Sequence, residues 1–470
     1  MPHLASLLDT WAFMAPGRLF DHVDGEGDCE LNKGAAAGIL AITVVGAFAC
    51  SSSPSVDPAA IQRGHDVFHD RVLAGLGGNG RACSDCHRDA DGFQLSPADA
   101  EARFQQMSAS GVDDPLFRPI DADDYVANGA AASDYSNLRQ SGLIRIRFPL
   151  PANIKLVDPT SCMTDGVPAD CQTATAYSVS PATFADVWRA VPSVLNVSVT
   201  GPAPQSSTWP RGPNSQGGYQ LDARVGTLQE QALGAFLGHG ELTTQPTTQM
   251  LDDVAGYETS LLADPEPALS DLETTGKGVF LRACSQCHGG PGMSAPITEP
   301  QRILRFVDDL NDCPRPVDSE SPARWDLPPC TPALARNQQT YEVSFDDGFT
   351  IRKTSSDPGR VLLTGYVFSG EPEANGSCLH SPCGLRQDDD WQKLDVPGLH
   401  GISKTAPCFH NNSAATLEDV VIHYEEFFKN VSVLDPSPDL PPVLTTDNIN
   451  RDRPNVPAER AALVAYLMRL

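Results

Sequence analysis

Apolar residues recur at helical spacing in several stretches of the chain. One stripe follows Thr416 and Asp419, which together offer an N-terminal cap, and its members are Leu417, Val420, Val421, Tyr424, Phe427 and Phe428. The stripe predicts a helix with Tyr424 facing inward. A second capping pair, Thr227 and Glu230, precedes a short helical pattern that ends at Gly238, and residues 457–470 read as an amphipathic C-terminal helix.

A different apolar pattern lies near the N-terminus. Residues 34–49 form a mainly apolar run after Lys33, which is short for a membrane span but typical of the core of a secretory signal. We therefore expect residues 1–50 to be a leader and the protein to be periplasmic. Residues 1–32 are too acidic for an ordinary leader, so translation starting near Leu31 is one hypothesis. Cys50, followed by a Ser-rich tether over residues 51–57, leaves open a lipid anchor or plain export.

Composition narrows the class of protein. The chain has 470 residues, enough for two or three domains, and its 40 prolines and 38 glycines indicate many loops. Its formal charge of −27 would repel phosphate backbones, so we expect no nucleic-acid partner. The acidity either serves solubility or attracts a basic redox protein.

The chain has thirteen cysteines, and in an exported protein we expect many of them to be paired. Three pairs close in sequence are expected to form local disulfides: Cys162 with Cys171, Cys313 with Cys330, and Cys378 with Cys383. Cys408 is then an unpaired and buried thiol.

Four further cysteines lie in two near-identical strings, CSDCH at residues 83–87 and CSQCH at 284–288. Each string follows a stretch that we expect to be helical, residues 61–70 and 274–283. Cys-x-x-Cys-His is the attachment signature of c-type haem, in which both thiols bond to the porphyrin and the histidine ligates iron. Cys83 and Cys86 with His87, and Cys284 and Cys287 with His288, would thus hold two haems. The alternative, one four-thiolate zinc site, does not explain why each pair carries its own histidine.

The segment after Asp395 contains Thr405-Ala406-Pro407-Cys408-Phe409-His410 and resembles the bacterial di-haem cytochrome c peroxidase and MauG family. In that family the sixth ligand of the second haem lies fourteen residues after the last histidine of this motif, a methionine in the peroxidases and a tyrosine in MauG. Here that position is Tyr424. His423 and Met293 are the rival ligands.

The resemblance extends to residues 188–242, where Gln231 matches the family's active-site glutamine and Glu241 its catalytic glutamate. Two positions depart from the family. Its proline after the glutamine is Ala235, and its inter-haem tryptophan is Leu221, which puts hole transfer in doubt unless Trp188 or Trp209 fills the gap.

The family's calcium site is only partly matched. Thr405 and Pro407 occupy two of the ligand positions, but the asparagine position holds Ala190, so calcium stays an open alternative.

The resemblance implies a mainly α fold with two cytochrome c-like haem domains packed against each other, over residues 58–249 and 250–470, with long irregular loop insertions. It implies an enzyme that reacts with hydrogen peroxide at the N-terminal haem. The oxidising equivalents would go to a small redox protein (cytochrome c or cupredoxin) or to residues of a protein substrate. Two alternatives remain: an electron-transfer cytochrome with His239 on the first iron, and a dioxygenase of the rubber-oxygenase type.

Overall fold

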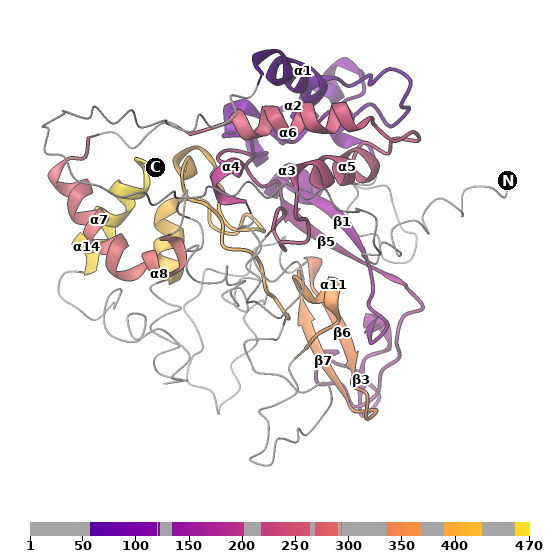
Figure 1. Ribbon diagram of the computed structural model, residues 1–470. Helices are drawn as coiled ribbons and strands as arrows, with labels where there is room; N and C mark the ends of the chain where they lie inside the picture. Colours follow the sequence, from indigo (N-terminus) through magenta and orange to yellow (C-terminus); the bar gives the residue numbers. More distant parts are fainter. Residues whose placement is uncertain are drawn as a thin grey trace, which may run out of the picture. The chain divides into compact units, whose positions relative to one another are not determined.

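The helices predicted before the two Cys-x-x-Cys-His strings are both present in the computed structural model of the chain (Figure 1). Helix α1 spans Pro58–His69 and is capped by the Asp57 side chain, and α7 spans Asp271–Ala283 and is capped by Ser270. The predicted C-terminal helix is α14, Val456–Leu467. These three predictions of helix are confirmed.

The structure describes residues 57–119, 121–122, 134–201, 218–263, 268–289, 293, 336–367, 390–424 and 456–470. The other α-helices are α2 (Pro97–Ser110), α3 (Ser136–Ser141), α4 (Val197–Thr200), α5 (Leu228–Gly238), α6 (Thr248–Ser260), α8 (Ser285–His288) and α11 (Val361–Thr364). Short 3₁₀ helices are η2 (Cys83–Asp85), η3 (Asp89–Asp91), η4 (Pro115–Phe117), η6 (Pro159–Ser161) and η9 (Ile402–Lys404). The predicted leader, residues 1–50, and the predicted tether up to residue 56 lie outside the described residues.

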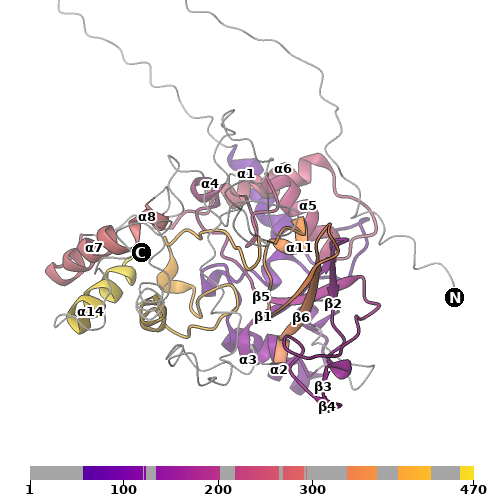
Figure 2. The same ribbon diagram turned by 90° about the horizontal axis from the view of Figure 1, so that it is seen from below.

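The same close contact between two helices, called the helix joint below, occurs twice. Helices α1 and α6 lie side by side, as do α7 and α14 (Figures 1 and 2). In the first pair a Cβ added to Gly64 would lie 1.9 Å from the Asp253 carbonyl oxygen, and in the second a Cβ added to Gly276 would lie 1.9 Å from that of Ala462. Only glycine lets the backbones approach so closely.

An aromatic pair follows one turn after each of these contacts. Phe68 lies edge-on to Tyr257 with ring centroids 5.2 Å apart, and Phe280 lies edge-on to Tyr466 at 5.7 Å. Each aromatic residue stands four positions after its contact residue. The two halves of the chain therefore build one structural joint twice.

The expectation of a mainly α fold with irregular loop insertions is met only in part, because the described residues also form strands. Strand β1 (Leu143–Pro149) pairs antiparallel with β5 (Phe184–Ala190). Strands β2 (Ile154–Leu156), β6 (Gln339–Ser344) and β7 (Thr350–Ser355) form a sheet in that order, and β3 (Met163–Thr164) pairs with β4 (Val167–Pro168). The physical reason is alternation: in β1 the side chains of Ile144 and Ile146 are apolar, and Arg147 between apolar neighbours pairs with Asp186 across the strands.

One hydrophobic core spans both predicted domains. It contains Phe148, Ile154 and Val187 from before residue 249 and Tyr341 and Trp391 from after it. The pairing of β2 with β6 joins the same two parts of the chain. Residues 56–470 accordingly cluster as one compact unit, within which the division at 249/250 stays a prediction.

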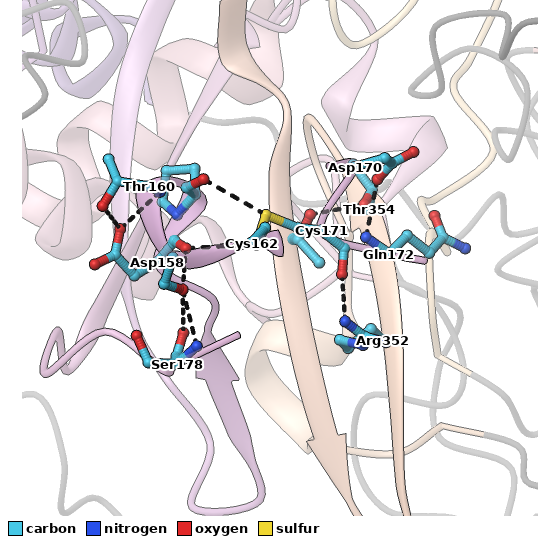
Figure 3. Close-up of a disulfide and its surroundings, with 12 residues drawn as sticks. Asp158, Thr160, Cys162, Asp170, Cys171, Gln172, Ser178, Arg352 and Thr354 are labelled. Atoms are coloured by element: carbon cyan, nitrogen blue, oxygen red, sulfur yellow. Dashed lines mark hydrogen bonds between the residues drawn. A yellow bond between two sulfur atoms is a disulfide. The ribbon is translucent and has the colours of Figure 1, made fainter. Parts of the chain in front are cut away.

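The predicted disulfide between Cys162 and Cys171 is confirmed (Figure 3). Arg352 of β7 donates to the Cys171 carbonyl at 2.7 Å, so the bridged loop is attached to the three-stranded sheet. Cys408 is buried, as expected. The other two predicted pairs, at 313/330 and 378/383, lie outside the described residues.

None of the helices in the described part of the chain is both long and apolar enough to cross a membrane.

Candidate haem-binding cavity

The first Cys-x-x-Cys-His string forms a 3₁₀ turn, η2, in which the His87 amide donates to the Cys83 carbonyl at 2.9 Å. Asp85 anchors this turn from inside. Its buried carboxylate accepts from the Ala82 amide at 2.9 Å and from the guanidinium groups of Arg71 and Arg103. The two cysteines of the turn thus line the cavity, and the hydrogen bonds of Asp85 fix the backbone of the turn.

The second string begins at the C-terminal end of α7 and continues as α8. The Cys284 amide donates to the Phe280 carbonyl at 2.8 Å, and the His288 amide donates to the Cys284 carbonyl at 2.9 Å. The backbone bond between the first cysteine and the histidine is therefore the same in both strings.

Both histidines are oriented by a backbone carbonyl. Nδ1 of His87 lies 3.0 Å from the Phe93 oxygen, and Nδ1 of His288 lies 3.0 Å from the Met293 oxygen. Phe93 and Met293 both have left-handed backbones, with φ of 61° and 58°. A hydrogen bond from Nδ1 leaves Nε2 as the nitrogen that can bind a metal, so both rings are oriented for metal binding through Nε2.

Burial also keeps both rings neutral. It lowers the pKa of His87 to about 4 and lowers the pKa of His288 as well. A neutral imidazole is the form that coordinates iron.

The two strings line one cavity of about 410 Å³. Its wall includes all four cysteines and both histidines, together with many apolar side chains. Within the described residues no three His, Cys, Asp or Glu side chains gather as a metal-ion site, so the four thiols are not collected into the single zinc site considered above.

Glu258 of α6 also lines the cavity, and burial raises its pKa to about 8. Its Oε2 atom has no hydrogen-bond partner among the described residues. A buried carboxyl oxygen of this kind needs a partner from a bound group or water. Paired cysteines, oriented histidines and this oxygen fit a covalently bound haem at each string.

Helix α5 forms the wall near the first string, and it begins as predicted, with Thr227 Oγ1 accepting from the Glu230 amide at 3.1 Å. Gln231, Ala235 and His239 stand at intervals of four and all three line the cavity. Glu241, the predicted catalytic residue, is exposed and outside the cavity lining, and its carboxylate accepts from Asn79 at 3.2 Å. Gln231 is therefore placed as expected, and Glu241 is not brought to it.

His239 is fixed by groups that the sequence did not associate with it. Its Nδ1 lies 2.9 Å from Asp121 Oδ2, and Arg81 donates to the same oxygen at 3.0 Å. Arg81 also donates to the His239 carbonyl at 2.7 Å. The sequence carries no local signal for this network, because Asp121 and His239 are 118 positions apart.

Near the second string, residues 417–424 are helical, and Thr416 and Asp419 make the predicted reciprocal cap. Tyr424 lines the cavity. Desolvation raises its pKa above the ordinary value, and the electrostatic effect of Cys287 and Cys284 adds to this. The rival His423 is buried against Phe409, with ring centroids 5.1 Å apart, and in the described part of the chain neither it nor Met293 is among the lining residues.

Leu221, at the family's tryptophan position, lines the cavity, and its carbonyl accepts from the Asp395 amide at 2.8 Å. Trp188 is instead buried against Leu143 and Ala190 in the β1–β5 pair, outside the described lining. Trp209 lies outside the described residues. The described residues therefore bring no tryptophan to the cavity.

Arg189 of β5 ties the cavity wall together through a buried ion-pair network. It donates to Asp222 at 2.6 Å and, through two nitrogens, to Asp357 at 2.6 and 2.9 Å. Burial alone would raise the pKa of Asp222, but Arg224 and Arg189 outweigh it and lower the pKa to about 2. Breaking such a pair would leave a buried charge, so the network fixes this wall.

Two residues of the calcium alternative, Thr405 and Ala190, line the cavity. Thr405 is buried with its hydroxyl donating to the Ile402 carbonyl at 3.2 Å, and the Ala406–Pro407 peptide bond is cis. The amide of Ala190 donates to the His410 carbonyl at 2.6 Å. Calcium binding at Thr405 and Pro407 stays a prediction.

No protein-family model matches the chain, and no curated protein matches it. Among solved structures it is similar to a MauG-like protein associated with microbial copper homeostasis, at 16% identity and a TM-score of 0.39, over 88% of this chain and 89% of that one. It is also similar to hydrazine synthase of Kuenenia stuttgartiensis, at 15% identity and a TM-score of 0.29, over 76% and 86%. Likenesses this distant establish no family.

Proposed function

We propose that the protein is a di-haem c-type oxidoreductase that reduces hydrogen peroxide at its N-terminal haem site. The observation that carries this proposal is the pair of Cys-x-x-Cys-His strings lining one cavity, each with its histidine oriented through Nδ1 by a backbone carbonyl. The repeated helix joint supports two cytochrome c-like modules, since each string belongs to a half with its own glycine contact and aromatic pair.

Covalently bound haem would supply the redox-active iron that exchanges electrons with peroxide and with a donor. Cys83 and Cys86 would hold the first group by thioether bonds, and His87 would ligate its iron. Cys284, Cys287 and His288 would hold the second.

The two sites differ on their far sides, and this difference supports a division of labour. The first is bordered by the α5 wall, where Gln231 and the small side chain of Ala235 line the cavity. The second is bordered by Tyr424, whose phenol oxygen is a hard ligand that favours the oxidised metal. Peroxide would therefore react at the first site, and the second would pass electrons.

The balanced reaction takes hydrogen peroxide, two protons and two electrons to two water molecules. The electrons would come from a reduced small redox protein or from side chains of a protein substrate. The formal charge of −27 would favour a basic partner. The apolar run at residues 34–49 supports export to the periplasm, where haem is attached, with Cys50 as the site of a lipid anchor in the anchored alternative.

Peroxide consumption with a reductant tests the proposal. We expect wild-type protein to consume peroxide catalytically, Cys83→Ala/Cys86→Ala protein to lose the reaction, and Cys284→Ala/Cys287→Ala protein to react once without turnover. Wild-type protein with two low-spin haems that ignore peroxide would contradict the proposal and favour an electron-transfer cytochrome.

A further inference from the structure

Peroxide cleavage needs a group that removes a proton from one oxygen and returns it to the other. Building on the proposed function, we propose that His239, held by Asp121, is this acid/base residue, in place of Glu241. The first observation is position: His239 lines the cavity that contains His87, and Glu241 does not among the described residues.

The end of α5 explains this position. His239 is the residue after the helix and keeps a helical backbone, with its amide bonded to the Ala235 carbonyl at 2.9 Å. It therefore extends the row formed by Gln231 and Ala235. At Glu241 the backbone has φ of 51°, and the side chain leaves this row and reaches Asn79.

The network behind His239 suits proton transfer. Asp121 is buried, and its carboxylate accepts from the imidazole Nδ1, so the lone pair is on Nε2. Arg81 donates to Asp121 and to Pro115 and Arg118 carbonyls, which fixes the carboxylate. This is the arrangement of an oriented general base, a histidine with a carboxylate behind it.

The charged and titratable groups around His239 are few in the described structure. Asp121 and Arg81 contact it directly, and His239 contributes electrostatically to the lowered pKa of His87. Arg81 stands two positions before Cys83, so the network is built into the first haem-binding turn.

In the proposed step Nε2 of His239 accepts the proton of one peroxide oxygen and delivers it to the other oxygen, which leaves as water as the O–O bond breaks. The remaining oxygen leaves as the second water after it receives two electrons from the donor and two protons from solvent. Gln231, on the same wall, would position the peroxide by a hydrogen bond.

Stopped-flow cyanide binding to the ferric protein tests the role without relying on activity, because hydrogen cyanide must also lose a proton to bind iron. We expect His239→Asn to slow both cyanide association and peroxide reaction by roughly 10²–10⁴-fold, with the first haem high-spin before and after the change. His239→Gln serves as a second variant if His239→Asn lacks haem. His65→Asn, at a half-exposed histidine that is not among the described lining residues of the cavity, should leave both rates unchanged.

Asp121 is a positioning residue, and a double-mutant cycle separates this from a structural role. Asp121→Asn should slow cyanide association about tenfold in the wild-type background and little in the His239→Asn background. Equal losses in both backgrounds would show a structural role only and overturn this part of the proposal.

Two results would overturn the role of His239. Slow rates in Glu241→Gln with normal rates in His239→Asn would return the role to Glu241 and leave the proposed function intact. A low-spin first haem that becomes high-spin in His239→Asn would make His239 an iron ligand. If wild-type protein ignores peroxide, the proposed function fails, but the cyanide rates still report on His239.

Discussion

The repeated helix joint gives the sharpest structural prediction, Gly276→Ala against Gly278→Ala in the same helix. At Gly276 an added methyl group would lie 1.9 Å from the Ala462 oxygen, about 1.5 Å short of the 3.4 Å at which ordinary contact begins. Helices α7 and α14 would have to separate. At Gly278 the nearest atom is Arg282 Nη1, at 3.6 Å.

The two substitutions are expected to change the free energy of unfolding in opposite directions. Alanine stabilises a helix by about 0.5–1 kcal/mol over glycine, and overpacking costs about 1–3 kcal/mol. We therefore expect Gly276→Ala to lower the free energy of unfolding by roughly 1–2 kcal/mol. Gly278→Ala should raise it by about 0.5–1 kcal/mol.

Urea denaturation of the holoprotein, followed by far-ultraviolet circular dichroism, measures both. Gly64→Ala, in the equivalent joint of α1 with α6, should behave like Gly276→Ala because its methyl group also meets a carbonyl oxygen at 1.9 Å. If Gly276→Ala is as stable as Gly278→Ala, the close backbone contact is wrong and the equivalence of the two joints fails.

Three further predictions concern the disulfide and the cavity. Replacing Cys162 and Cys171 by serine should cost roughly 2–3 kcal/mol, measured by urea denaturation, because the bridge closes a short loop. Tyr424→Met should raise the potential of the second haem by on the order of 100 mV, within the roughly 0.8 V over which axial ligands act, measured by spectroelectrochemistry. A potential that does not move would exclude Tyr424 as a ligand. The pKa of Glu258 is about 8 against an ordinary 4.5, so it holds a proton in the folded state that the unfolded chain has lost, and stability should fall as pH rises from about 4.5 to about 8. Urea midpoints at pH 5 and pH 8 should differ less in Glu258→Gln than in wild type, and equal differences would refute the assignment.

Short-range patterns in the sequence predicted the features that depend on residues close together in the chain. The helices before the two haem strings, the caps at Thr227 and Thr416, the disulfide at Cys162 and the inward Tyr424 all follow from spacing within a few residues. The strands were not predicted, although β1 alternates apolar residues with arginines, because the fold class was taken from a resemblance that implied mainly helices. The alternation of apolar residues and arginines in β1 could have predicted this strand.

The pairing of distant residues could not be predicted in this way. Gly64 and Gly276 each stand four positions before a phenylalanine, which is visible as a repeat, but their contact residues lie in helices far along the chain. The Asp121–His239 pair is likewise a product of tertiary structure. Spacing matched Glu241 to the family's glutamate, yet the left-handed backbone at that residue turns its side chain away from the cavity.

The intact mass of the protein, made in a host that attaches haem in its periplasm, tests the central claim most directly. We predict a mass that exceeds that of the mature chain by two haem groups, with one group lost in Cys83→Ala/Cys86→Ala protein and the other in Cys284→Ala/Cys287→Ala protein. A folded wild-type protein with the mass of the bare chain, or with a zinc ion and no haem, would contradict the account.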